Sequence, residues 1–229
     1  MRLQGLVFDV DGTLAETEET HRIAFNETFA AAGLGWHWSR EDYFALIQTT
    51  GGKERMRRHR DDLGQSRPDN DTIAALHAEK TGRYAALLGA GGLSLRPGVA
   101  ALVEGARRAG LKLAVATTTN RPNVDTLCRA CWNAPAEDVF DVIAAGDEVA
   151  HKKPAADVYE LALARLGLPA ASCIAFEDSE NGVRAARAAG LRVLATPSIY
   201  TRDDDFSAST WRRETLERRH LPEDLAAVA

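Results

Sequence analysis

Two aspartates near the start of the chain are the residues best placed to do chemistry. Asp9 and Asp11 follow an apolar run at residues 6–8, and Gly12 comes directly after them. Alternate side chains of an extended segment point to the same side, so we expect both carboxylates to meet at the carboxyl end of a strand. Like charges this close repel each other unless a cation lies between them. Oxygen ligands of this kind favour Mg2+ over zinc.

The same residues have a simpler explanation, in which the two aspartates only end a strand and begin a turn. A calcium loop of the EF-hand type is excluded, because position 13 offers no third acidic ligand and Thr20 stands where the loop-closing glutamate belongs. The choice between a turn and a metal site therefore depends on which other residues the fold brings beside Asp9 and Asp11.

The chain has the composition of an ordinary globular protein, with 229 residues, of which 45% are apolar and 27% charged. Its net charge is −5 and it has no basic tail, so we expect no nucleic-acid partner. No apolar run approaches the roughly 20 residues that cross a membrane, and we identify no signal peptide. We therefore expect a cytoplasmic protein without membrane contact. Its sparse cysteines, Cys128, Cys131 and Cys173, are expected to be thiols.

Residues 16–95 are predicted to form a small all-helical domain. Their apolar residues recur at helical spacing, and glycine, proline or asparagine breaks each run. We expect hinges near residues 15–16 and in the glycine-rich stretch 89–95. The predicted helices cover residues 17–32, 40–48, 53–63 and 69–88.

The remainder, residues 1–15 and 96–229, alternates between strand and helix patterns. The predicted strands are apolar on both faces, which is typical of a parallel sheet covered by helices on both sides, an α/β fold. Such sheets bind ligands beyond the carboxyl ends of their strands. The polar last thirty residues are predicted to form a surface helix. The predicted strands cover residues 3–8, 111–118, 141–146, 171–178 and 191–196.

Polar side chains follow three further strands of this predicted sheet. Thr117 ends the second strand, where its hydroxyl and a following helix can donate to an oxyanion. Lys153 precedes a proline outside a helix, whereas its neighbour Lys152 is expected to be a solvated surface charge. Glu177 and Asp178 end the fourth strand. Each alone has an ordinary explanation as a helix cap, a surface charge or a dipole partner. Their joint position beside the first strand favours one site.

The motifs FDVDGTL, AVATTTN, KKPAADVY and FEDSENG resemble the four signature motifs of the haloacid dehalogenase superfamily of phosphotransferases. The helical block between the first two resembles the cap of the β-phosphoglucomutase-like branch. More narrowly, AETEETHRIAFNETFA, TTGGKER and DVIAAGDEVAHKKP resemble the CbbY-type phosphatases of the Calvin cycle. The resemblance implies a Rossmann-like core with an inserted all-α cap, Mg2+ as cofactor, and hydrolysis of xylulose 1,5-bisphosphate, an inhibitor of Rubisco.

The resemblance also implies roles for the acidic residues. Asp9 is expected to be the nucleophile that forms an aspartyl-phosphate, and Asp11 the general acid and base, whose backbone carbonyl also faces the metal. Asp178 is expected to hold Mg2+ together with Asp9. Glu177 is expected to bind the metal through water or to orient one of its ligands.

The second and third motifs are expected to bind the reacting phosphate. Thr117 and Lys153 would contact its oxygens, with the lysine as a compact charge. The residues that follow in the second motif, Thr118, Thr119 and Asn120, are expected to contact the substrate.

The helical block must supply the second half of the site. Gly51, Gly52, Lys53, Glu54 and Arg55 form a glycine-led turn into a helix, which is a natural seat for a second phosphate. The alternative is an ordinary helix start with solvated charges.

Four other residues of the block are candidates for substrate binding. His77 and Lys80 lie one helical turn apart and can add to the same anion site. Glu18 and His21, just past the first hinge, resemble substrate-contacting residues of the branch. A lone histidine at this position is more often half-buried in a helix.

The sequence thus predicts a monomeric, Mg2+-dependent sugar-bisphosphate phosphatase that converts xylulose 1,5-bisphosphate to xylulose 5-phosphate. The nearest rival is a β-phosphoglucomutase-like sugar phosphomutase, which shares both aspartates and the cap. A phosphoglycolate-type phosphatase would not need the cationic turn of the block. A silent sugar-phosphate-binding regulator would not need a nucleophile and an acid together.

Overall fold

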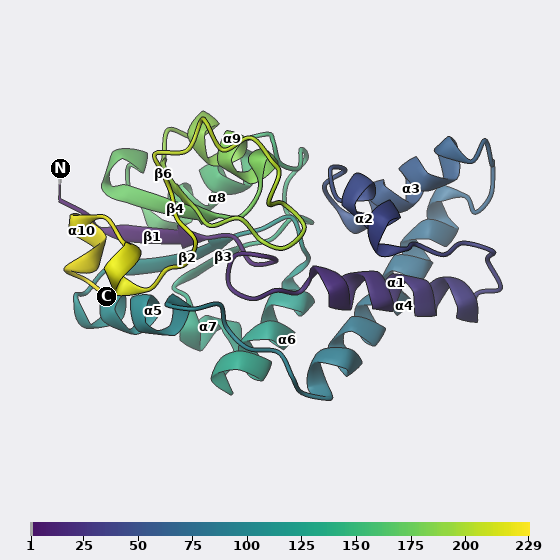
Figure 1. Ribbon diagram of the computed structural model, residues 1–229, viewed down its shortest axis with the longest axis horizontal. Helices are drawn as coiled ribbons and strands as arrows, with labels where there is room; N and C mark the ends of the chain where they lie inside the picture. Colours follow the sequence, from purple (N-terminus) through teal and green to yellow (C-terminus); the bar gives the residue numbers. More distant parts are fainter. Residues whose placement is uncertain (1) are drawn as a thin grey trace.

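The computed structural model describes residues 2–229, apart from the side chain at position 224. Its centre is a parallel sheet in the order β3-β2-β1-β4-β5-β6, with β1 flanked by β2 and β4 (Figure 1). The five predicted strands are present within two residues of their expected bounds, which confirms the α/β fold class. The strands are β1 (Gly5–Phe8), β2 (Lys112–Ala116), β3 (Val142–Ala144), β4 (Cys173–Glu177), β5 (Arg192–Ala195) and β6 (Trp211–Arg212).

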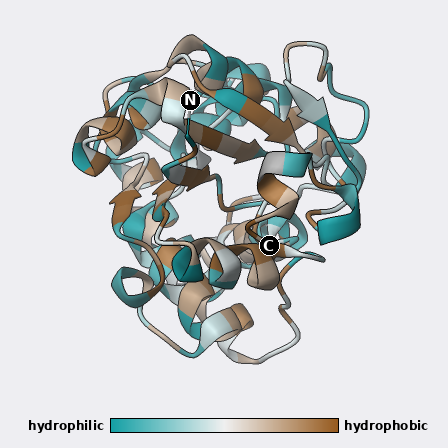
Figure 2. Ribbon diagram, turned by 90° about the vertical axis from the view of Figure 1, so that its left-hand side faces the viewer, coloured by the Kyte–Doolittle hydropathy of each residue, from teal (hydrophilic) through white to brown (hydrophobic). Residues whose placement is uncertain are grey.

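The sheet is buried on both faces because its strands are apolar throughout. On β1, Leu6 and Phe8 belong to one buried cluster, whereas Val7 belongs to another on the opposite face. The strands are accordingly mostly brown, the colour of apolar residues, in Figure 2. Helices α5 (Val99–Arg108), α6 (Arg121–Trp132) and α7 (Ala136–Val139) contribute to the first cluster, and α8 (Asp157–Leu166) and α9 (Glu180–Ala188) to the second.

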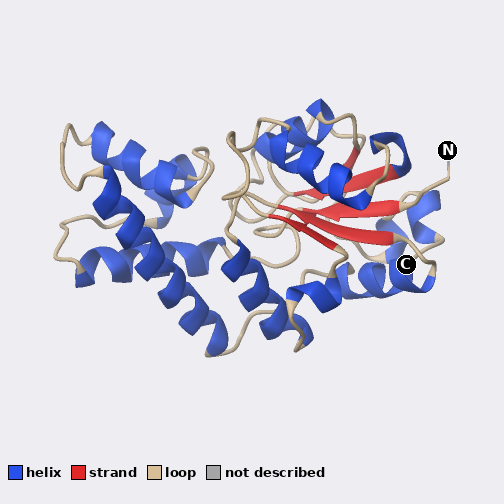
Figure 3. Ribbon diagram, turned by 180° about the vertical axis from the view of Figure 1, so that it is seen from behind, coloured by secondary structure: helices blue, strands red, loops and turns tan. Residues whose placement is uncertain are grey.

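The four predicted helices of residues 16–95 form a separate block beyond the carboxyl ends of the strands (Figures 1 and 3). The block has its own apolar core, in which the Phe29 ring lies 5.3 Å from that of Trp36 and 4.8 Å from that of Trp38. Asp69 caps the longest helix by accepting a hydrogen bond from the Thr72 amide. The helices are α1 (Glu18–Ala31), α2 (Arg40–Leu46), α3 (Gly52–Asp62) and α4 (Asn70–Gly89).

The two connections between the block and the sheet lie side by side. Ala15 forms an isolated antiparallel bridge with Leu95. Arg96 then donates to the backbone carbonyls of Thr196 at 2.7 Å and Pro197 at 2.8 Å, beyond the end of β5. Both crossings are therefore held at the carboxyl edge of the sheet. The division into residues 16–95 and the remainder stays a prediction.

The predicted surface helix at the C-terminus is wrong. Residues 211–229 form the short strand β6, a single 3-10 turn and the short helix α10 (Glu223–Ala226). Leu216, Leu221 and Leu225 are buried in the same cluster as α5, and the Leu216 amide donates to the Pro97 carbonyl. In the sequence these leucines lie among many charged residues, so their place in the core is apparent only from the cluster that they share with α5. Within the part of the chain that is described, no helix is both long and apolar enough to cross a membrane.

Candidate active site

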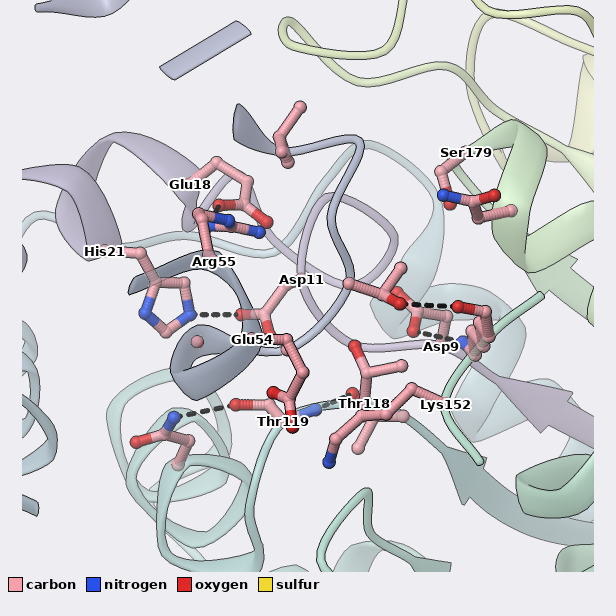
Figure 4. A pocket seen from close by; sticks show the side chains of 18 of the residues that line it. Asp9, Asp11, Glu18, His21, Glu54, Arg55, Thr118, Thr119, Lys152 and Ser179 are labelled. Carbon is pink, nitrogen blue, oxygen red and sulfur yellow. Dashed lines mark hydrogen bonds and ion pairs between the residues drawn. The ribbon is translucent and has the colours of Figure 1, made fainter. Parts of the chain in front are cut away.

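A cavity of about 190 Å³ lies between the carboxyl edge of the sheet and helices α1, α3 and α4 (Figure 4). Every residue that the sequence predicted for the site lines this cavity, with the exception of Glu177. From the sheet side these are Asp9, Asp11, Thr117, Thr118, Thr119, Asn120, Lys153 and Asp178, and from the helical block Glu18, His21, Gly51, Gly52, Lys53, Glu54, Arg55, His77 and Lys80.

Three buried carboxylates meet at the carboxyl ends of β1 and β4. One oxygen each of Asp9, Glu177 and Asp178 lies within 4.8 Å of the others. The parallel register pairs Phe8 with Phe176, so the residues that follow the two strands are neighbours. This register brings together acidic residues that are far apart in the sequence.

Among the described residues, a single lysine forms ion pairs with this cluster. Lys153 Nζ lies 2.6 Å from Asp9 Oδ1 and 2.6 Å from Glu177 Oε1, and the lysine is itself buried. The Tyr159 hydroxyl donates to Glu177 Oε1 at 2.5 Å. Burial alone would lower the pKa of Lys153, but the carboxylates of Asp9 and Glu177 outweigh it and raise that pKa above its ordinary value. One cation therefore lies among three acidic groups.

The cluster has the chemistry of a site for a hard divalent cation. Burial, with the Glu177 charge nearby, raises the pKa of Asp9 to about 8, and burial beside Asp9 and Glu177 raises that of Asp178. Glu177 Oε2 is buried and has no hydrogen-bond partner among the described residues. Gly12, at φ +84°, leaves room for the cluster, because a Cβ there would lie 2.2 Å from Asp178 Oδ2. A set of three carboxylates whose negative charge is only partly compensated by Lys153 fits Mg2+.

Asp11 lines the same cavity as Asp9, and its charge contributes to raising the pKa of Asp9, but it is not one of the three clustered carboxylates. Its Oδ1 accepts a hydrogen bond from Thr17 at 2.6 Å and lies 2.9 Å from His21 Nε2. Burial would raise the pKa of Asp11, but His21 and the Thr17 hydroxyl outweigh it and lower that pKa to about 2. The turn after β1 covers residues 12–14, beyond Asp11. The assignment of its backbone carbonyl to the metal stays a prediction.

His21 links Asp11 to a buried lysine of the block. Lys80 Nζ forms a hydrogen bond with His21 Nδ1 and lies 4.7 Å from the centroid of the Phe25 ring. Burial lowers the pKa of Lys80 to about 7. His77, also on α4, has a pKa lowered by burial to about 3, which leaves its ring neutral. Neither His77 nor Lys80 is therefore a fully charged phosphate ligand in this state.

Arg55 is paired inside the helical block. Its NH1 donates to the Tyr43 hydroxyl at 2.5 Å and lies 3.8 Å from Glu18 Oε2, which accepts from the same hydroxyl at 2.8 Å. The Arg55 side chain is buried, so its charge is already compensated where the sequence predicted a free phosphate ligand. Its role in binding substrate stays a prediction.

Two other lysines face the cavity from opposite sides. Lys53 comes from α3, and Lys152 from the loop before Lys153. Neither forms an ion pair within residues 2–229, and Lys152 Nζ donates to the Gly146 carbonyl at 2.6 Å. The expectation that Lys152 is a solvated surface charge is wrong, since it is half-buried at the cavity, where its Cδ packs close to Gly51.

The comparisons with known proteins identify the family of this chain. Residues 3–190 match the family model of the haloacid dehalogenase-like hydrolases. The chain belongs to this family. It is 63% identical to Protein CbbY of Rhodobacter capsulatus over 212 residues, which cover 93% of each chain. The predicted superfamily, the resemblance to CbbY and the enzyme class of phosphatase are thereby confirmed.

Solved structures agree with this relationship. The crystal structure of CbbY from Rhodobacter sphaeroides in complex with phosphate superposes with a TM-score of 0.90 at 52% identity, over 94% of this chain and 95% of the other. A mutant of that protein in complex with xylulose-(1,5)bisphosphate superposes with a TM-score of 0.89 at 51% identity and the same coverage.

Sequence reasoning missed several polar residues that line the cavity from loops and from the start of α9. Thr50 donates to the Lys153 carbonyl at 2.5 Å, and Asn181 donates to the Gln48 carbonyl at 3.2 Å. Thr201 and Asp204 come from the loop after β5. The position of Asn181 within the fourth motif could have identified it as a site residue. Single polar residues in loops form no recognisable pattern.

Proposed function

We propose that this protein is a Mg2+-dependent sugar-bisphosphate phosphatase that converts xylulose 1,5-bisphosphate to xylulose 5-phosphate. The observation that carries the proposal is the cavity itself, which combines a buried carboxylate cluster, a second aspartate in contact with a histidine, and unpaired lysines on both walls. Support for this sugar comes from the similar CbbY protein that was crystallised with xylulose bisphosphate. In this proposal residues 16–95 act as a cap over the core.

Asp9, Asp178 and Glu177 would hold the Mg2+ ion, as their clustered oxygens and unmet negative charge support. When bound, the ion would neutralise these carboxylates and polarise the phosphoryl group. The remaining charge compensation is supplied by Lys153, which already contacts Asp9 and is placed to bind a phosphoryl oxygen as well. The Thr117 hydroxyl accepts from the Thr119 amide at 3.1 Å, so its own O–H is available to a phosphoryl oxygen.

Asp9 would attack the phosphorus atom, and the bond from phosphorus to the sugar oxygen would break as the bond to Asp9 forms. Asp11 would donate a proton to the departing sugar oxygen. A water molecule would then attack the aspartyl-phosphate and transfer a proton to Asp11, which releases inorganic phosphate and restores both side chains. The protein lowers the pKa of Asp11 to about 2, but a phosphate dianion arriving beside it raises that pKa by like-charge repulsion, so Asp11 can carry the proton during turnover.

The second phosphate would bind between Lys53 and Lys152. These two lysines approach the cavity from the block and from the core. Neither forms an ion pair within residues 2–229, although the Glu54 and Asp147 carboxylates lie near enough to Lys152 to raise its pKa against the effect of burial. A phosphate between them would join the two walls, so binding energy remote from the reacting phosphorus would help to close the site. The glycine-led turn at residues 51–52 is retained in this proposal, with Lys152 in the place predicted for Arg55.

The test is phosphate release from sugar mono- and bisphosphates in the presence of Mg2+. We expect wild type to release one phosphate from xylulose 1,5-bisphosphate without a priming cofactor. Lys152→Gln should weaken activity on the bisphosphate more than on 4-nitrophenyl phosphate, because only the bisphosphate occupies the second site. Interconversion of sugar monophosphates by wild type would favour a phosphomutase, and equal losses on both substrates would reject the second phosphate site.

A further inference from the structure

The loop after β5 contacts both the helical block and the carboxylate cluster. Tyr200, in this loop, is only 7% exposed and packs within the apolar core of the block. Its ring centroid lies 4.5 Å from that of Phe44 and 5.4 Å from that of Tyr43, which it meets edge-on at 84°. A side chain from the sheet domain thus completes the core of the block.

The loop also makes polar contacts with the block, and the Tyr200 hydroxyl itself donates to Glu19 Oε2 at 2.5 Å. Asp204 accepts a hydrogen bond from Gln48 at 3.1 Å, and Glu16 accepts one from the Ile199 amide at 3.4 Å. Water can replace such contacts, so each contributes little to holding the two parts together. Burial of an aromatic ring between other rings contributes more. The Tyr200 ring therefore dominates the attachment that this loop provides.

The Tyr200 ring also supports residues that line the cavity. The ring packs against Tyr43, whose hydroxyl donates to Glu18 and accepts from Arg55. On the other side of the same loop, the Thr201 hydroxyl donates to the Asp178 backbone carbonyl at 2.5 Å. The loop consequently connects the acidic half of the site to the half supplied by the block.

We propose that Tyr200 is a positioning residue that holds the helical block closed over the core and, through Tyr43, fixes Glu18 and Arg55 at the cavity. The inference rests on the proposed function, in which the substrate spans both halves of this cavity. A sugar bisphosphate requires both halves at once. A small aryl phosphate requires only the acidic half, so its hydrolysis does not depend on how firmly the block is closed.

The experiment compares three full-length variants with Mg2+ on xylulose 1,5-bisphosphate and on 4-nitrophenyl phosphate. Tyr200→Ala should lower kcat/KM for the bisphosphate about tenfold and leave the aryl phosphate within about twofold, because the ring contact is lost only from the closed form. Tyr200→Phe keeps the ring and removes only the hydroxyl that donates to the part-exposed Glu19 carboxylate, so it should stay within about threefold of wild type on both substrates. Ile199→Ala, which shortens a side chain that is 55% exposed in the same loop, is the matched control and should behave as wild type.

Equal proportional losses of Tyr200→Ala on both substrates, or equal damage from Tyr200→Phe and Tyr200→Ala, would overturn the inference. An unchanged Tyr200→Ala would do the same. If wild type releases no phosphate from the bisphosphate, the proposed function fails, and Tyr200 is judged separately by hydrogen exchange of the amides of α2 in inorganic phosphate and Mg2+. Faster exchange in Tyr200→Ala than in Ile199→Ala would support the positioning role, and equal exchange would reject it.

Discussion

Replacing Lys153 by methionine tests how the carboxylate cluster is stabilised. The substitution keeps an apolar stem of similar length and removes the charge that lies 2.6 Å from both Asp9 and Glu177. Breaking a buried ion pair by removing one partner destabilises a protein by about 3–5 kcal/mol, because the charge left behind has no compensation. For a chain of this size each kcal/mol corresponds to about 2–4 °C in Tm, so in the presence of chelator we expect Tm to fall by roughly 6–20 °C.

The cost of Lys153→Met should depend on pH. The pKa of Asp9 is raised in the folded protein to about 8, so between pH 4 and pH 8 the folded state binds a proton that the unfolded state has released. Stability therefore falls as pH rises through this window. Loss of the lysine raises the pKa of Asp9 further and extends the fall to higher pH. The pKa of Lys153 is itself raised, so its own stabilising contribution is fully present below about pH 10.5 and does not alter this comparison.

The assay is thermal or urea unfolding of metal-free protein at pH 6 and pH 9.5. Lys152→Met is the matched control, since Lys152 is the preceding residue and its Nζ bonds only to the Gly146 carbonyl among the described residues. We expect a loss for Lys153→Met at pH 6 and a larger loss at pH 9.5, because above pH 8 Asp9 stays protonated only in the variant, whose stability keeps falling. The control should lose under about 1 kcal/mol at both pH values. Similar losses in both variants, or a loss for Lys153→Met that does not grow with pH, would refute the reasoning.

Three further predictions concern catalysis. Asp9→Asn should fold normally and lose all phosphate release, because it removes the bond-forming oxygen from the end of β1; residual turnover above about one per cent of wild type would reject Asp9 as the nucleophile. Asp11→Asn should lower kcat by about 10² to 10⁴ for a sugar phosphate, and a loss under tenfold would assign Asp11 another role. Chelation should stop turnover while the circular dichroism spectrum remains unchanged, because two large apolar clusters hold the sheet independently of an ion; full activity in excess chelator would contradict this.

The elements and the catalytic motifs could be predicted from the sequence because both depend on local information. Strands that are apolar on both faces alternate with amphipathic helices, which specifies a parallel sheet, and a parallel sheet gathers whatever follows its strands at one edge. The sequence alone therefore predicts which residues are neighbours at this edge, namely Asp9, Thr117, Lys153 and Asp178. The helices of the block could be predicted equally well, because the spacing of their apolar residues and the glycine-rich stretch that follows them do not depend on contacts elsewhere in the chain.

Only the tertiary structure shows which charged side chains lack an ion-pair partner among the described residues. Arg55 and Lys152 look alike in sequence as cations beside glycine-rich or proline-containing turns. The first is neutralised by Glu18 and Tyr43 from other helices, whereas the second reaches the cavity unpaired within the described residues. The burial of Tyr200 and Leu216 could not be predicted either. Both lie in polar C-terminal segments and become buried by packing, Tyr200 against α2 and Leu216 in the same apolar cluster as α5. Partners supplied by distant segments set the charge and burial of a side chain, and no local pattern encodes that pairing.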